Sequence, residues 1–187
     1  AMPRFADDAL KAVHRLPGAA SNGMSGLAHM RGGEENETEV VFDGLPLIQP
    51  FHLRLIQSPT SVLDERVVDS MDVYTGGLTA EYGDRMSSVV DIRSVHPEAD
   101  QHYELGISNF HFNGLAAQRF DDGQGQWLAA LRASNLDLTA DLINFDLGEP
   151  HYLDGYGRLD YDFSEDTRAS LHVLAARDRS RELSKDS

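Results

Sequence analysis

The chain has 187 residues, enough for one ordinary domain or for a small domain with part of another. Its formal net charge of -15 argues against nucleic acid as a partner, because phosphate binding needs a basic surface. The lack of cysteine excludes disulfides and thiolate chemistry, and no apolar run approaches the ~20 residues of a membrane-spanning helix.

The first half of the chain is made of short predicted elements separated by glycine and proline. Apolar spacing predicts a helix over 6–16 with Asp7 as its N-cap. Three prolines exclude a regular helix or a central strand from 45–60, so a long, partly ordered loop is expected there. The remaining elements are one or two helical turns over 61–67 and strands at 27–32, 39–44, 69–76 and 87–94. This order indicates a small α+β domain that ends near Ser94.

After Pro97 the chain alternates apolar and polar residues, which is typical of half-exposed strands. In the clearest case Leu159, Tyr161 and Phe163 share one face of a strand, and Arg158, Asp160 and Asp162 share the other. In a second strand Trp127, Ala129, Leu131 and Ala133 lie opposite Arg132. The five predicted strands are 103–109, 112–120, 126–134, 155–163 and 167–178.

The connections between these strands differ in length. The segments "DDGQGQ" and "SEDT" are tight polar turns, whereas "NLDLTADLINFDLGEPHYLD" is a long connection. Short turns at one end of the strands and long loops at the other are typical of an outer-membrane β-barrel. The competing interpretation is an antiparallel meander of a soluble protein with one wet face, and alternation alone favours it.

Four motifs in order resemble the TonB-dependent outer-membrane receptors. "ALKAVHRLPGAA" is similar to the opening helix of their plug domain, and "HMRGG" resembles an Arg-Gly strand end. "VVFDGLPL" resembles an apolar strand, its Asp-Gly turn and the apolar-Pro-apolar step that follows. "MDVYTGGLTAEYGDRMSSVVDIRS" resembles the last plug strands before the barrel.

The resemblance implies a fold and a function. Residues 1–97 would form an α+β plug domain with a mixed four-stranded sheet and short helices, and 98–187 the first antiparallel strands of a transmembrane β-barrel. The parent protein would lie in the outer membrane of a Gram-negative cell, with the plug inside the barrel lumen. It would bind a scarce extracellular solute (siderophore-iron, cobalamin or an oligosaccharide) and import it by plug rearrangement coupled to the TonB protein. Its partners would be TonB, the small solute or metal chelate, and outer-membrane lipid.

Two departures from this family lead us to expect a fragment. We find no TonB-recognition segment before Phe5. The large transporters have about 22 strands, and five strands cannot close, because an open sheet edge is not tolerated in lipid. The alternative is a freestanding soluble binding module with a plug-like fold.

The candidate ligand-binding residues are Gln49, Phe51 and His52, whose loop resembles one that faces the outside entrance in this family. An amide, an aromatic ring and an imidazole suit a polar chelate or a glycan, whereas plain loop packing is the alternative for Phe51. Arg31 would end a plug strand and pair with barrel acids, or else be an exposed arginine at a turn. The other plug residues that the motifs imply, for close approach and tight turns, are Gly32, Gly33, Asp43, Gly44, Gly76, Gly77, Tyr82 and Gly83.

No enzyme, cofactor or metal site is predicted. The histidines lack metal-ligand spacing, and the glutamates at 34, 35, 37 and 39 lack the pattern of a calcium loop, so a solvated acidic turn is expected. Neither glycine pair carries the lysine or the spacing of a phosphate-binding loop. A hydrolase would rest only on scattered Ser, His and Asp residues.

Overall fold

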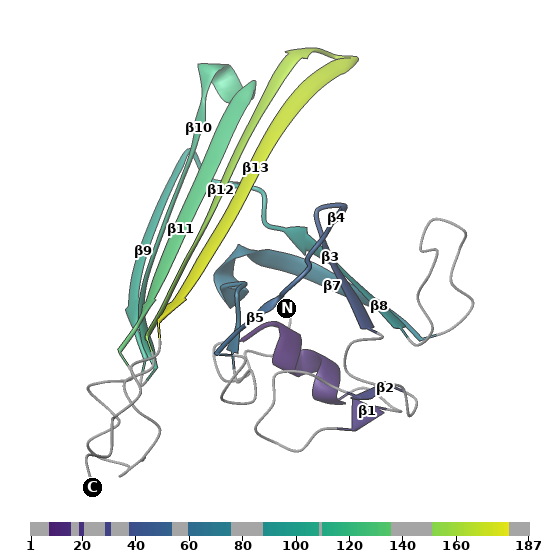
Figure 1. The fold of residues 1–187 in the computed structure, drawn as a ribbon. Coiled ribbons are helices and arrows are strands. Elements are labelled where there is room, and N and C mark those ends of the chain that lie inside the picture. Colours follow the sequence, from purple (N-terminus) through teal and green to yellow (C-terminus); the bar gives the residue numbers. More distant parts are fainter. Residues whose placement is uncertain are drawn as a thin grey trace, which may run out of the picture. The chain divides into compact units, whose positions relative to one another are not determined.

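The computed structural model of the chain divides into two compact units, Ala1–Val95 (unit 1) and His96–Ser187 (unit 2) (Figure 1). Within the described part, strands predominate and the helices are short 3-10 turns, so the predicted α+β class is only loosely correct. In the same ranges no helix is long and apolar enough to cross a membrane. The structure describes residues 8–15, 19–20, 29–30, 38–53, 60–75, 88–108, 110–135 and 151–179.

Unit 1 contains a mixed four-stranded sheet, as the resemblance implied. Its order is β4-β3-β8-β7, in which β3 and β8 are parallel and the other neighbours antiparallel. The strands are β3 (Thr38–Phe42), β4 (Leu45–Pro46), β7 (Val68–Tyr74) and β8 (Ser88–Ser94). The central strand β8 carries Val89, Val90 and Ile92, all essentially inaccessible to solvent, and these form the core of the sheet.

One predicted strand of unit 1 lies elsewhere. Instead of 27–32, the fourth strand of the sheet is β4, and β2 (His29–Met30) pairs with β1 (Ala19–Ala20) in a separate two-stranded sheet. Pro46 fits in β4 because that strand lies at the edge, where a missing N–H breaks no ladder.

The start of unit 1 also differs from the prediction. Within the predicted helix at 6–16 the described residues form a 3-10 helix, η1 (Leu10–Arg15), at whose start the Asp8 carboxylate accepts the Leu10 amide at 3.0 Å. The predicted N-cap, Asp7, lies outside the described residues. The same buried carboxylate accepts the Ser61 amide at 2.5 Å. Asp8 therefore ties η1 to the hairpin of β5 (Phe51–His52) and β6 (Thr60–Ser61), which lies within and just beyond the predicted loop. The helical turns expected at 61–67 are η4 (Glu65–Val67).

Unit 2 is a five-stranded antiparallel meander in which each strand pairs with the next (Figure 1). All five predicted strands are present, and β12 begins at His151, before its predicted start at residue 155. The 3-10 turn η6 (Asp121–Gly123) joins β10 to β11, and a two-residue turn joins β12 to β13. The described strands leave β9 and β13 as open edges. The strands are β9 (Gln101–Ile107), β10 (His111–Phe120), β11 (Gly125–Ser134), β12 (His151–Ser164) and β13 (Thr167–Arg179).

Candidate functional site: the two faces of the large sheet

The register of unit 2 places large apolar side chains on one face of the sheet. Residues directly opposite each other on antiparallel strands point to the same side. Ile107 pairs with Phe112, and Leu159 pairs with both Trp127 and Leu171. The apolar face carries Tyr103, Leu105, Ile107, Phe112, Trp127, Leu131, Leu153, Leu159, Phe163, Leu171 and Val173. All of these except Trp127 are strongly exposed, and Leu105 reaches 91%.

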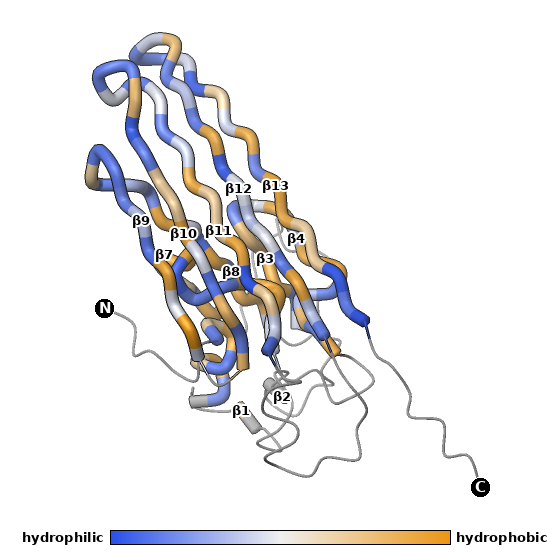
Figure 2. Tube along the Cα trace, turned by 90° about the vertical axis from the view of Figure 1, so that its left-hand side faces the viewer, coloured by the Kyte–Doolittle hydropathy of each residue, from blue (hydrophilic) through white to orange (hydrophobic). Residues whose placement is uncertain are grey.

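The opposite face carries the charged and most of the polar side chains and is buried in its centre, where Leu115, Ala117, Leu128 and Ala130 lie among them. From His151 to Asp160 of β12 every second residue is buried, on the polar side, and the residues between them are intermediate or exposed. Figure 2 shows hydrophilic and hydrophobic residues interspersed along the same strand. The polar face carries His111, Arg132, Tyr152, Asp154, Tyr156, Arg158, Asp160 and His172. A sheet folded for water buries its apolar face, whereas the wall of a membrane barrel turns apolar residues to lipid and polar ones to the lumen. The sheet of unit 2 has the second pattern.

An ion pair lies at the centre of the polar face. Arg132 and Asp154 are direct cross-strand partners, and both side chains are at least 96% inaccessible. The Arg132 Nε and Nη2 atoms each lie 2.9 Å from Asp154 Oδ2. The guanidinium also lies over the Tyr152 ring, 5.5 Å from its centroid. Because both charges are shielded from water, the loss of either one would be costly.

Two tyrosine–histidine pairs flank this ion pair. The Tyr152 hydroxyl lies 3.1 Å from His111 Nδ1, and the Tyr156 hydroxyl lies 3.0 Å from His172 Nδ1. Each pair joins different strands, so the contacts hold β10, β12 and β13 in register from the polar side.

A second charged cluster lies nearer the short turns. Asp160 Oδ2 accepts Arg158 Nε at 2.7 Å and Gln126 Nε2 at 2.8 Å. Arg158 Nη2 donates to His96 Nε2 at 2.6 Å, which requires a lone pair on that ring nitrogen. Within the described residues, no group of three His, Asp or Glu side chains is arranged to hold a metal ion. Hydrogen bonds and ion pairs link the polar side chains of this face to one another.

Aromatic residues gather at the short-turn end. The Tyr161 ring lies 4.9 Å from Phe163, edge to face, and 6.2 Å from Phe120. The Tyr161 hydroxyl donates to Asp121 in the turn η6. The three rings thus rest on the apolar side while the hydroxyl reaches a charged turn.

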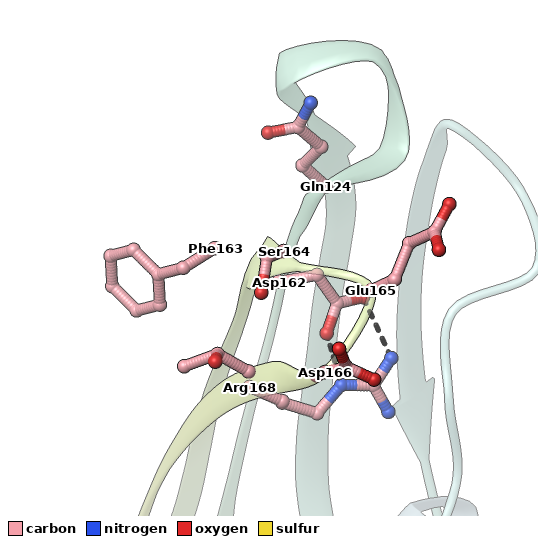
Figure 3. A pocket seen from close by; sticks show the side chains of 8 residues that line it. Gln124, Asp162, Phe163, Ser164, Glu165, Asp166 and Arg168 are labelled. Carbon is pink, nitrogen blue, oxygen red and sulfur yellow. Dashed lines mark hydrogen bonds and ion pairs between the residues drawn. The ribbon is translucent and has the colours of Figure 1, made fainter.

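The turn between β12 and β13 borders a hollow (Figure 3). Asp162 accepts two bonds from Arg168, and the Phe163 ring points away from this pair (Figure 3). Glu165 and Asp166 make the remaining lining mainly acidic. An exposed ion pair beside two carboxylates is an ordinary solvated turn.

The predicted ligand-binding residues do not share one exposed surface. Gln49 is exposed, whereas Phe51 and His52 are buried at 8% and 1% exposure in the β5–β6 hairpin. A ligand could reach these two side chains only if the hairpin opened. Their role in binding stays a prediction.

Asp43 and Gly44 form the β3–β4 turn, with positive φ angles of 48° and 80°. Both central residues of such a two-residue turn need this conformation, which Asp-Gly adopts readily. Asp43 Oδ1 also accepts the Ser94 amide at 2.9 Å, and so joins the turn to β8. The other predicted plug residues lie outside the described residues: Arg31, Gly32, Gly33, Gly76, Gly77, Tyr82 and Gly83.

Sequence reasoning missed the partners on the polar face. It placed Arg132, Arg158 and Asp160 opposite the apolar residues but did not identify Asp154 or Tyr152. The signal was present, because both residues have the same parity as Asp160 along β12. Extending the predicted strand 155–163 back to residue 151 would have placed both residues on the polar face.

No protein-family model matches the chain. No curated protein matches it either. Among solved structures, the chain is similar to the ferric enterobactin receptor of Pseudomonas aeruginosa, crystallised as a mutant in complex with enterobactin. The TM-score is 0.60 at 14% identity, over 92% of this chain and 31% of that one. At this identity the likeness concerns the fold alone, and the chain spans about a third of the receptor's length.

Proposed function

We propose that this chain is the N-terminal part of a TonB-dependent outer-membrane receptor, comprising its plug domain and its first barrel strands. The observation that carries the proposal is the reversed burial of unit 2, where the apolar face is exposed and the polar face is buried. The fold likeness to a siderophore receptor supports it. Five strands with two open edges also fit part of a larger barrel.

The parent receptor would bind a scarce extracellular solute and import it by TonB-coupled rearrangement of the plug. The similar receptor was crystallised with enterobactin, which supports a small-molecule ligand. Siderophore-iron, cobalamin and oligosaccharides all remain compatible with the polar lining of unit 2. Gln49, Phe51 and His52 are the proposed contacts in unit 1, and the work of the protein would be binding and conformational change, with no covalent step.

The second candidate is a freestanding soluble module with a plug-like fold. It would have to leave the apolar face of unit 2 in water or cover it with a partner. Monodisperse behaviour without detergent would favour it, as would a gene that encodes no further alternating strands.

The chain has a single tryptophan, Trp127, and it lies on the apolar face. We expect brominated phosphatidylcholine to quench its fluorescence strongly when the complete gene product is reconstituted into bilayers. Iodide in the water phase is expected to quench it weakly. Strong iodide quenching together with no effect of bromine would overturn the receptor proposal.

A further inference from the structure

The apolar face carries arginine at one end only. Arg177 and Arg179 lie at the C-terminal end of β13, and both are exposed. Arg177 is the cross-strand partner of Leu153, and Arg179 is the partner of His151, which places both arginines on the apolar side. On the described strands no aspartate or glutamate lies on this face. Two cations therefore border an apolar surface that carries no acidic side chain on its described strands.

The other end of the same face carries rings instead of charges. Phe120, Tyr161 and Phe163 lie beside the short turns, with the Tyr161 hydroxyl bonded to Asp121. Aromatic residues whose polar edge contacts water are typical of the depth at which the hydrocarbon core of a bilayer meets the lipid headgroups. The two ends of the apolar face therefore differ, because arginines lie at one end and aromatic rings at the other.

The distance between the borders fits a bilayer. From Leu153 to Phe163 the strand advances about 33 Å at ~3.3 Å per residue. A tilt of ~35–45° reduces this to about 23–27 Å along the membrane normal, close to the ~25 Å apolar band of outer-membrane barrels. Arg177, opposite Leu153, then lies at headgroup depth.

We propose that Arg177 and Arg179, with His151 beside them, bind the phosphate of an anionic lipid headgroup at the long-connection end of the sheet. This rests on the proposed function, since it requires the apolar face to contact lipid. A guanidinium forks onto phosphate oxygens through paired N–H donors, and the apolar residues next to it accommodate the acyl chains. The site would select lipids whose headgroup has a net negative charge over zwitterionic ones, and would fix the depth of β13 in the membrane.

The test uses the complete gene product, purified in detergent and equilibrated with equal amounts of phosphatidylglycerol and phosphatidylcholine. Mass spectrometry measures the ratio of the two lipids that the protein retains. We expect phosphatidylglycerol to be enriched and the R177Q/R179Q double variant to lose about 10- to 30-fold of that enrichment, since each basic residue at a membrane surface contributes ~1 kcal/mol. The matched control is R93Q, which removes an exposed arginine from unit 1 and leaves the ratio unchanged.

Two further measurements separate the possible outcomes. Added inorganic phosphate displaces phosphatidylglycerol if the site recognises any phosphate, and fails to do so if the acyl chains are also needed. Bromine quenching of Trp127 with no phosphatidylglycerol enrichment, or with enrichment that survives in the double variant, overturns the lipid site alone. Absence of the quenching overturns the proposed function itself.

Discussion

The two sheets of this chain differ in the side chains that their inner strands bury. In β8 of unit 1 the inaccessible residues are Val89, Val90 and Ile92, with Ser88 and Ser94 at its ends, whereas in β12 of unit 2 they are two tyrosines and the charged residues Asp154, Arg158 and Asp160. The backbone pairing is antiparallel in both β7–β8 and β12–β13, and each of these pairs has one register shift. The difference therefore lies in what each sheet faces. A strand that contacts water buries its apolar side chains, whereas a strand that contacts lipid can expose them. The exposed apolar face of β12 has the second pattern.

The two units should consequently respond differently to the same kind of mutation. Unit 1 is expected to lose stability when apolar volume is removed from its core. Unit 2 is expected to lose it when a buried charge loses its partner, or when a charge is placed on its apolar face. Substitutions at Arg132, Ile92 and Leu159, each compared with a control, test this contrast.

The largest effect is expected for R132M. It leaves Asp154 buried without its opposite charge, and breaking a buried ion pair from one side costs about 3–5 kcal/mol. The measurement is the free energy of unfolding in urea, in detergent micelles. The double variant R132M/D154L removes both charges and is expected to recover most of the loss.

The control for this pair is R93Q. Arg93 lies 3.8 Å from Asp72 with both side chains more than half exposed, so the loss should stay below about 1 kcal/mol. If R132M and R93Q cost the same, the polar face of unit 2 is solvated and the contrast between the sheets is wrong.

These same residues show how much of the structure could be predicted from the sequence. The strands of unit 2 and their two faces could be predicted because alternation is a local pattern. The Arg132–Asp154 pair could not, because its register depends on the long connection between β11 and β12. In unit 1 the two-residue strand β4 was missed, since Leu45 and Pro46 carry no strand periodicity and pair only because the Asp43-Gly44 turn brings them back onto β3.

The next effect is expected in the core of unit 1. Ile92 is fully inaccessible, so I92A removes packed apolar volume and should cost about 2–5 kcal/mol. L105A removes a similar volume from a side chain that is 91% exposed on the apolar face of unit 2, and unfolding in water should barely change. Equal losses from the two variants would contradict the exposure of Leu105 on the apolar face of unit 2.

A charge on the apolar face should weaken insertion into a bilayer. Leu159 lies between Leu153 and Phe163 on β12, near the middle of the exposed apolar stretch. L159R is expected to reduce the free energy of folding into phosphatidylcholine bilayers by about 2–4 kcal/mol. Y74R, at an exposed apolar residue of the small sheet, should change it by about 0.5 kcal/mol or less. Comparable losses would show that the apolar face of unit 2 does not meet lipid.

The smallest effect is expected at the β3–β4 turn, where D43A and D43N separate two contributions. Alanine loses the acceptor for the Ser94 amide and adopts the positive φ of 48° poorly, and together these should cost about 1–2 kcal/mol in urea unfolding. Asparagine keeps an acceptor oxygen and tolerates the left-handed conformation, so D43N should stay within about 0.5 kcal/mol of the wild type. A loss in D43N as large as in D43A would mean that the carboxylate charge, rather than the turn geometry, joins this hairpin to β8.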